Sequence, residues 1–134
     1  MDLADSCVFI GAFNPRDSEH KKSAAIIEAI DGKKFRAEIT DYILDEILTF
    51  VRKKSGYENS LAVLKILESH PNINCIRVDD KSYNDAFDVF RRYPALSFTD
   101  ATSVSVMRNH NIRNIYSFDG GFDGIKGIKR KDSV

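Results

Sequence analysis

The stretch Leu96-Ser97-Phe98-Thr99-Asp100-Ala101 combines the start of a helix with an acidic side chain on an apolar helix face. Ser97 and Asp100 have the spacing of a capping box, in which each side chain accepts a hydrogen bond from a backbone N–H of the first turn. Asp100 also shares a helix face with Val104 and Met107, so we expect its carboxylate to point inward. Capping and metal binding are compatible roles for Asp100, and the rest of the chain decides whether the second role applies.

The composition predicts one soluble globular domain that spans residues 1–134. Hydrophobic residues make up 43% of the chain, and no apolar run approaches the ~20 residues that cross a bilayer. The start, Met1 to Asp5, is acidic and lacks the basic segment of a signal peptide, so we expect a cytoplasmic protein without membrane contact. The 20 basic and 20 acidic residues balance, which argues against non-specific attraction to nucleic acid but permits a local basic patch.

Short apolar runs alternate with helical patterns, which predicts a mainly parallel sheet covered by helices. Strands are expected at residues 3–4, 35–39, 73–78 and 114–118. Helices are expected at about residues 17–31, 40–54, 55–70, 79–93 and 97–110. The run Ser6–Phe13 fits either a strand or a buried helix, because it is almost wholly apolar. In the helix over 79–93, Tyr83, Ala86, Phe87 and Phe90 have the spacing of one apolar face.

Four acids occupy places that a parallel sheet would bring to one edge, the edge where ligands gather in such folds. Asp5 ends the first apolar run, and Asp119 closes the last predicted strand. Glu46 lies at the border of its helix's apolar stripe, and Asp100 begins another helix. Each also has a plain structural explanation, as a helix cap, a rim glutamate or a turn residue. Asp123 is a weaker candidate of the same kind.

Carboxylates that share one pocket repel one another unless a cation compensates them. An all-oxygen site suits Mg²⁺ or Mn²⁺, whereas zinc is disfavoured because His20, His70 and His110 are isolated in the sequence. No P-loop, dinucleotide-binding glycine motif or serine-hydrolase motif occurs. Taken together, the acids predict a site for Mg²⁺ or Mn²⁺.

Four pieces of the chain, in this order and spacing, resemble the PIN domain, a family of metal-dependent ribonucleases. The resemblance is strongest to compact toxin nucleases of the VapC type and their archaeal relatives, and it covers nearly the whole chain. It implies a three-layer α/β/α sandwich with a central, mainly parallel sheet of four to five short strands. The pieces are Asp5-Ser6 followed by Val8-Phe9-Ile10, then Thr40 to Glu46, Leu96 to Ala101, and Ser117 to Phe122.

The resemblance implies hydrolysis of RNA at a metal held by four acids, leaving a 5′-phosphate and a 3′-hydroxyl. The metal-binding acids would be Asp5, Glu46, Asp100 and Asp119. Supporting positions around them would be Ser6, Thr99 and Asp123. Candidate contacts to RNA are Arg52, Lys53, Arg91 and Arg92, although the first two also suit the C-terminal end of a helix.

Two departures from the family pattern bear on the site. Little chain precedes Asp5, so the first strand must be short, and Gly120-Gly121 replaces more polar residues that usually precede that phenylalanine. Neither departure removes an acid. The resemblance further implies a cognate antitoxin protein and a homodimer.

Other functions are also compatible with the same pattern. A PIN-like chain could instead be a factor in RNA processing or decay, or a module that binds RNA or protein without cutting. A phosphoacceptor domain of the receiver type is disfavoured, because Asp119 rather than a lysine ends the last predicted strand.

Overall fold

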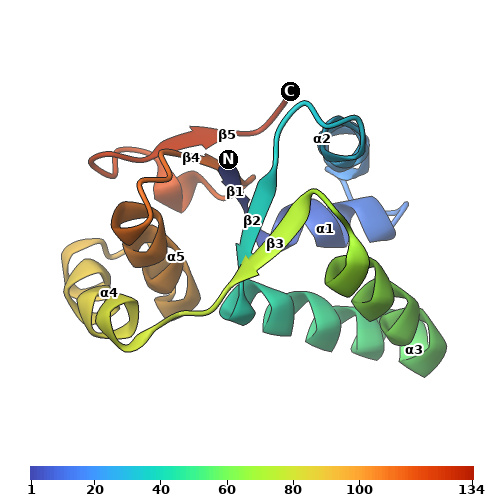
Figure 1. Cartoon of the computed structure of the whole chain (residues 1–134), viewed down its shortest axis with the longest axis horizontal. Coiled ribbons are helices and arrows are strands. Elements are labelled where there is room, and N and C mark those ends of the chain that lie inside the picture. Colours follow the sequence, from blue (N-terminus) through green and yellow to red (C-terminus); the bar gives the residue numbers. More distant parts are fainter.

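The computed structural model describes residues 1–134 and has a five-stranded parallel sheet at its centre (Figure 1). The strands pair in the order β3-β2-β1-β4-β5, and every pair is parallel. This arrangement confirms the predicted α/β sandwich with a parallel sheet. The strands are β1 (Asp2–Ala4), β2 (Ala37–Thr40), β3 (Ile73–Ile76), β4 (Asn114–Tyr116) and β5 (Lys129–Lys131).

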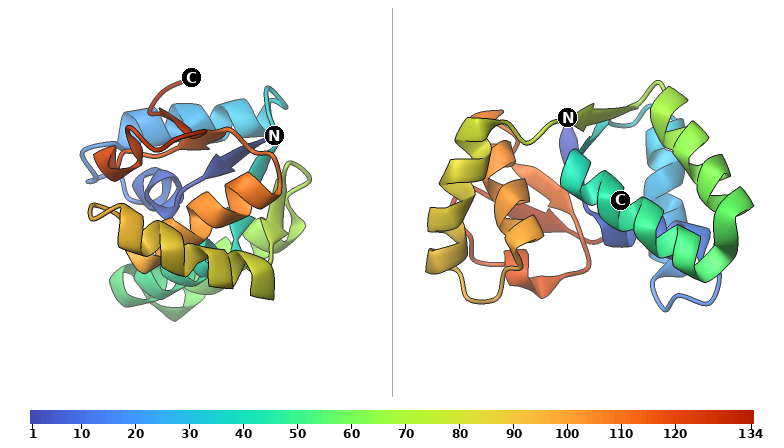
Figure 2. Two further views of the ribbon diagram at one scale, coloured as in Figure 1. Left: turned by 90° about the vertical axis from the view of Figure 1, so that its left-hand side faces the viewer. Right: turned by 90° about the horizontal axis from the view of Figure 1, so that it is seen from below.

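Two helical layers cover the sheet. Helices α1, α2 and α3 lie on one side of it, and α4 and α5 pack as a pair on the other (Figures 1 and 2). The helices are α1 (Ser6–Phe13), α2 (His20–Asp31), α3 (Asp41–Ser69), α4 (Asp80–Arg92) and α5 (Phe98–Asn109), with a short 3₁₀ turn η1 (Gly120–Phe122).

The ambiguous run after β1 is the buried helix α1, which packs against both α2 and α3. A helix enclosed on several sides can be apolar all round. For this reason the hydrophobic periodicity of the run could not distinguish a helix from a strand. Its contact with α2 depends on Gly11, because a Cβ there would lie 2.3 Å from Ser23 Oγ. Phe9 is 1% exposed and is among the largest side chains of the core.

Helix α3 bends sharply at Gly56, whose φ of 85° and ψ of −178° lie outside the helical region. The predicted break between two helices is therefore at the right place. Thr40 is the side-chain cap of α3, and beside the bend at Gly56 the Asn59 Nδ2 donates to the Ser55 carbonyl at 2.9 Å. Glycine suits this position since its φ is unfavourable for other residues.

Other details of the predicted elements need correction. The helix expected from about residue 17 begins only at His20, because Asp17 closes a preceding turn in which its carboxylate accepts from Glu19 N at 2.8 Å. Strand β5 lies in the tail where no element was expected. It consists of three basic residues at the edge of the sheet, where charge blunts unwanted pairing, so no apolar pattern marks it.

Parallel pairing and helix caps bring several segments to one edge of the sheet. Asp5 N donates to the Tyr116 carbonyl at 2.9 Å, which holds the ends of β1 and β4 together. Thr40 ends β2 and caps α3, since its hydroxyl accepts from Ile43 N at 3.1 Å. The starts of α1 and α3 and the turn η1 therefore follow the carboxyl ends of three adjacent strands.

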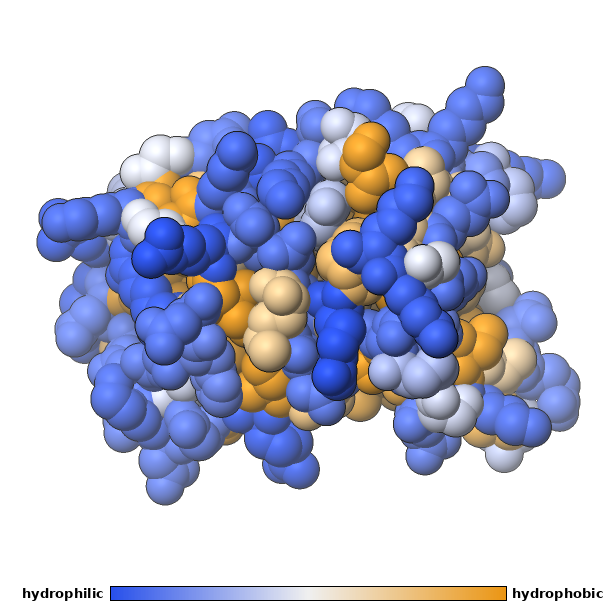
Figure 3. Space-filling model, turned by 45° about the horizontal axis from the view of Figure 1, so that its top comes forward, coloured by the Kyte–Doolittle hydropathy of each residue, from blue (hydrophilic) through white to orange (hydrophobic).

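The surface over the β4–β5 side of the molecule is mostly hydrophilic, with apolar side chains in separate patches (Figure 3). None of the helices combines the length and the apolar character that a membrane-spanning helix needs.

Candidate metal centre

Asp5 is the buried member of the acid cluster, with 6% of its surface exposed. Its Oδ1 accepts from Ser6 N at 2.8 Å and its Oδ2 accepts from Ser117 Oγ at 2.7 Å. The pKa of Asp5 is raised from 3.8 to about 6, mainly by burial and in smaller part by the negative charges of Asp100 and Glu46, while the hydrogen bonds from Ser117 and Ser6 oppose the shift. Asp5 is thus fixed in place and costly to ionise without a nearby cation.

Glu46 reaches the same place from the second turn of α3. Its Oε1 accepts from Ser6 Oγ at 3.0 Å, so Ser6 connects Asp5 and Glu46 through its backbone N–H and its hydroxyl. Desolvation of the carboxylate raises the pKa of Glu46, and the charges of Asp100 and Asp45 add to this effect. The border position predicted from the apolar stripe of this helix brings Glu46 toward the other acids.

Asp100 enters from the first turn of α5. The predicted capping box is confirmed, since Asp100 N donates to Ser97 Oγ at 3.0 Å and Ser97 N donates to Asp100 Oδ2 at 3.2 Å. Partial burial raises the pKa of Asp100, and the charge of Asp119 also contributes, against the hydrogen bonds to Ser97. Thr99 is half-buried in the same turn, and its carbonyl accepts from Thr102 Oγ1 at 2.6 Å.

Asp119 is the exposed member of the cluster and lies in the turn that follows β4. Its Oδ1 accepts from Gly121 N at 2.8 Å and so caps η1. Its backbone N–H donates to Ser117 Oγ at 3.1 Å. Asp119 therefore belongs both to the turn and to the network around Asp5.

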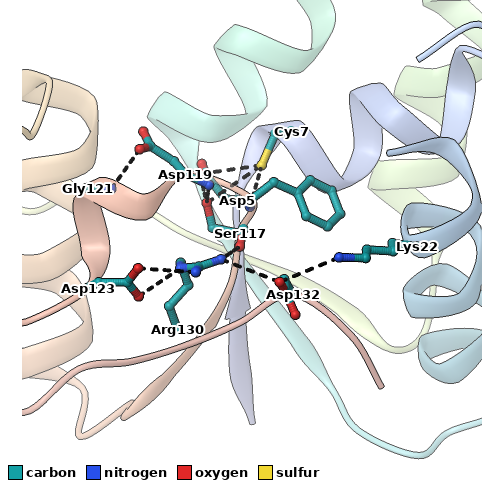
Figure 4. A network of polar contacts seen from close by, with 10 residues as sticks. Asp5, Cys7, Lys22, Ser117, Asp119, Gly121, Asp123, Arg130 and Asp132 are labelled. Carbon is teal, nitrogen blue, oxygen red and sulfur yellow. Dashed lines mark hydrogen bonds and ion pairs between the residues drawn. The ribbon is translucent and has the colours of Figure 1, made fainter. Parts of the chain in front are cut away.

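Ser117 joins these acids and was not predicted as a site residue (Figure 4). Its hydroxyl donates to Asp5, accepts from Asp119 N, and is fully buried. Its carbonyl accepts from Arg130 Nη1 at 3.1 Å, which ties the network to β5. Its position two residues before Asp119, within a piece that carries the resemblance, is the signal that could have identified it.

Cys7 packs against the same network, with its Sγ 3.7 Å from Asp5 Oδ2. Burial raises the pKa of the Cys7 thiol to about 12, and the charge of Asp5 raises it too, so the thiol stays protonated. Asp123 points elsewhere, because Arg130 Nε donates to its Oδ1 at 2.9 Å and Arg130 Nη2 to its Oδ2 at 3.1 Å (Figure 4).

The predicted RNA-contacting residues are dispersed over three places. Arg52 donates to Ser60 Oγ at 3.1 Å and its guanidinium lies 5.2 Å from the Tyr57 ring centroid. Arg91 pairs with Asp88 at 3.0 Å. The other two line separate clefts: Lys53 lies with Arg52 in a cleft of about 290 Å³, and Arg92 lies with Arg108 and Lys126 in a cleft of about 530 Å³.

The four acids form an electrostatically connected group, to which Arg130 is coupled only through Asp119. Asp100 raises the pKa of both Asp5 and Glu46, Asp119 raises that of Asp100, and no lysine or arginine contributes to any of these shifts. As the side chains lie, no three of them are close enough to share an ion, because each carboxylate is turned to hydrogen bonds of its own. The donor set of carboxylate and hydroxyl oxygens fits a hard divalent cation such as Mg²⁺ or Mn²⁺.

Comparisons with known proteins agree on one family. The model of the PIN domain family matches residues 3–128. A VapC ribonuclease of Archaeoglobus fulgidus is 33% identical over 127 residues, which cover 90% of this chain and 78% of that protein. Ribonuclease VapC13 of Mycobacterium tuberculosis is 49% identical over 94 residues, covering 70% of this chain and 68% of that protein.

Solved structures with the same fold include a toxin and a chain from a toxin–antitoxin complex. The crystal structure of Mycobacterium tuberculosis VapC20, a toxin that cleaves the sarcin-ricin loop, superposes with a TM-score of 0.77 at 24% identity, covering 90% of this chain and 91% of that one. A toxin–antitoxin complex from Klebsiella pneumoniae gives a TM-score of 0.69 at 17% identity, covering 96% of both chains.

Proposed function

The chain belongs to the PIN domain family, and on this premise we propose that it is an endoribonuclease that depends on Mg²⁺ or Mn²⁺, the toxin of a toxin–antitoxin pair. Two relatives are named as ribonucleases, and the matched region covers more than two thirds of the length of each. This supports RNA as the substrate. The observation that carries the proposal is the mutual repulsion of Asp5, Glu46 and Asp100, whose raised pKa values no lysine or arginine lowers.

The residues that would hold the ion are Asp5, Glu46, Asp100 and Asp119. When bound, the ion would lower the pKa of a water molecule and offset charge that develops on the phosphate. Asp5 would be the least mobile of the four, since it is buried and accepts two hydrogen bonds. Asp119, at the exposed end of the group, would be the first to meet RNA.

Protein groups around the acids would keep their oxygens aimed at the ion. Ser6 restrains both Asp5 and Glu46, and Ser117 restrains Asp5 while it fixes the backbone of Asp119. Such supporting hydrogen bonds commonly contribute tenfold to about a hundredfold in metal affinity or activity.

The test is cleavage of total cellular RNA with Mn²⁺, with mapping of the new ends. We expect the wild-type protein to leave 5′-phosphates and 3′-hydroxyls, and Asp100→Asn to be at least about 100-fold slower. Glu28→Gln, an exposed acid on α2, serves as the matched control and should cleave like wild type. Equal rates for wild type and Asp100→Asn would refute the assignment of the acids.

Metal binding can be measured without relying on cleavage. Because ion binding to the folded state stabilises it, Mn²⁺ should raise the melting temperature of wild type and of Glu28→Gln but much less that of Asp100→Asn. If Mn²⁺ leaves the wild-type melting temperature unchanged, a non-cleaving binding module becomes the better explanation.

We further propose a protein antitoxin as partner, a homodimer and a cytoplasmic location. The fold shared with the Klebsiella pneumoniae toxin–antitoxin complex supports the first of these. The experiment is co-expression with the product of any small neighbouring reading frame, followed by purification and light scattering. Recovery of a stable complex that no longer cleaves RNA is the expected result, and failure to associate would refute the pairing.

A further inference from the structure

Arg130, the middle residue of β5, donates hydrogen bonds to both ends of the segment that carries Asp119 (Figure 4). We refer to residues 117–123 as the Asp119 segment. At its first residue, the Ser117 carbonyl accepts from Arg130 Nη1 at 3.1 Å. At its last residue, the Asp123 carboxylate accepts from Arg130 Nε at 2.9 Å and from Arg130 Nη2 at 3.1 Å. One guanidinium group therefore joins the two ends of this segment.

The middle of the Asp119 segment has few restraints of its own. None of residues 118–121 is buried, and two of them are the adjacent glycines Gly120 and Gly121. Glycine has the widest range of backbone conformations, so a turn that contains two of them defines its own shape poorly. Phe122 is buried and anchors the end of η1, but its backbone N lies 3.4 Å from the Asp119 carbonyl oxygen, which is long for a hydrogen bond. The position of Asp119 therefore depends on how the ends of the segment are held.

Arg130 is suited to hold these ends because it is itself fixed in place. Its side chain is 21% exposed, and the pairing of β5 with β4 sets Arg130 opposite Ile115. Asp132 lies 3.9 Å from Arg130 Nη1 and pairs in turn with Lys22 of α2 at 3.6 Å. The planar guanidinium presents its donors in a rigid fork, which a lysine ammonium does not reproduce. Arg130 therefore connects the Asp119 segment to the sheet and to α2.

This arrangement leaves the carboxylate of Asp119 available for an ion. Arg130 makes no hydrogen bond or ion pair with Asp119, and its charge is matched by the contact with both oxygens of Asp123. Asp119 Oδ1 accepts from Gly121 N at 2.8 Å, whereas its Oδ2 has no hydrogen-bond partner in the chain. A basic side chain that bound Asp119 directly would instead compete with the ion.

We propose that Arg130 is the positioning residue for Asp119, holding both ends of the Asp119 segment so that this carboxylate stays beside the other acids of the metal centre; this rests on the proposed metal-dependent function. Asp123, which the family resemblance placed among the supporting positions, then acts through Arg130 rather than at the ion. Hydrogen-bonded partners of this kind contribute tenfold to about a hundredfold in metal affinity. Because Asp119 is exposed and one of four acids, we expect the lower end of that range.

The first measurement is the affinity of the full chain for Mn²⁺, taken from the electron paramagnetic resonance signal of the free ion. Arg130→Gln loses the fork of donors and should raise the Kd by about tenfold. Arg130→Lys keeps the charge but not the fork, so it should lose most of this affinity as well. Lys129→Gln, at the preceding, exposed position of β5, is the matched control and should bind like wild type. If Arg130→Lys binds like wild type, charge alone is sufficient and the proposal is overturned.

A double-mutant cycle with Asp119 separates positioning from a general loss of stability. If Arg130 acts through Asp119, Arg130→Gln should raise the Kd by less than about twofold in an Asp119→Asn background, because the carboxylate that it positions is already gone. The same fold-change in both backgrounds overturns the proposal, since Arg130 would then support the whole fold. Should Arg130→Gln fold poorly, Asp123→Ala breaks the same contact from the other side and takes its place in the cycle.

Amide hydrogen exchange without metal tests the same contact independently of the ion. The backbone N–H of Gly121 donates to Asp119 Oδ1, so its exchange rate reports on local opening of the Asp119 segment. Arg130→Gln should speed this exchange by about tenfold and leave that of buried Ile47 in α3 unchanged, whereas Lys129→Gln should change neither. Equal exchange of Gly121 in wild type and Arg130→Gln overturns the proposal.

Failure of the proposed function would look different. Wild-type protein that does not bind Mn²⁺, but in which exchange of Gly121 depends on Arg130, refutes the metal-dependent function and supports the hold of Arg130 on the segment. Wild-type protein that binds Mn²⁺ no more tightly than Arg130→Gln refutes the role of Arg130 and leaves the metal-dependent function intact.

Discussion

Asp5 and Asp119 come after neighbouring parallel strands, yet their surroundings are opposite. Asp5 follows the central strand β1 and leads into the buried helix α1, so it is 6% exposed. Asp119 follows β4 and leads into a single 3₁₀ turn at the surface. Sheet topology brings both to one edge, but the element that follows each strand decides how much water reaches the carboxylate. The same residue type therefore caps the following element at both positions, but carries a high electrostatic cost only at the buried one.

The largest expected difference between the two aspartates is in RNA cleavage. Asp5→Asn should lower kcat/KM by at least about 1,000-fold, because it removes the most rigidly held of the proposed metal-binding carboxylates. Asp119→Asn should lower it by about 10- to 100-fold, because this exposed carboxylate adapts more easily and asparagine still caps η1. Steady-state cleavage of one defined RNA with Mn²⁺ measures both values. Equal losses would mean that burial does not determine how much each of the four acids contributes to cleavage.

The next largest difference is in stability without metal. The folded pKa of Asp5, about 6, lies above its unfolded value of 3.8, so ionised Asp5 destabilises the fold. The penalty is absent below pH 4, grows as the pH rises from about 4 to 6, and is complete above that range. Asp5→Asn should therefore raise the free energy of unfolding at pH 7 by up to about 3 kcal/mol.

Urea unfolding with a chelator present, at pH 4 and pH 7, measures this difference. Asp119→Asn is the matched control and should change the free energy of unfolding by less than about 0.5 kcal/mol at either pH, as is usual at the surface. A gain for Asp5→Asn that is equally large at pH 4 would show that repacking, not charge, is the cause. Added Mn²⁺ should reduce the advantage of Asp5→Asn, because only wild type keeps the complete set of acids.

The sequence predicted the elements around the acids better than it predicted their contacts. The capping box of Ser97 and Asp100 follows from a local rule, and it occurs in the structure. A parallel sheet then implies which strand ends share an edge. The sequence could not show that Ser117 joins Asp5 to Asp119, because this contact spans 112 residues and depends on the register of β1 with β4.

What the sequence left undecided concerns residues whose role depends on what lies over them. The rings of Tyr83, Phe87 and Phe90 have the spacing of a core stripe, but nothing in the chain covers them. Strand β5 has no apolar residue and exists because β4 offers it hydrogen bonds, such as that from Ser117 N to the Lys131 carbonyl at 3.0 Å. Periodicity reports which residues could be buried, and only tertiary packing decides which of them are.

The smallest expected effect concerns the residue that joins the two aspartates. Ser117→Ala removes the hydroxyl that donates to Asp5 Oδ2 and accepts from Asp119 N, inside a fully buried position. We expect the free energy of unfolding to fall by about 1–2 kcal/mol, because the buried carboxylate of Asp5 and the backbone N–H of Asp119 each lose a hydrogen-bond partner. The lost bond lowers the pKa of Asp5 in the wild type, so its removal should raise that pKa further and move the pH-dependent loss of stability upward. Ser97→Ala removes the cap of α5 instead and should lower the free energy of unfolding by about 1 kcal/mol. It should not change the pH range over which ionisation of Asp5 reduces stability. Urea unfolding across pH 4 to 8 distinguishes the two variants. If the loss of stability with rising pH occurs over the same pH range in Ser117→Ala as in wild type, Ser117 does not control the charge of Asp5.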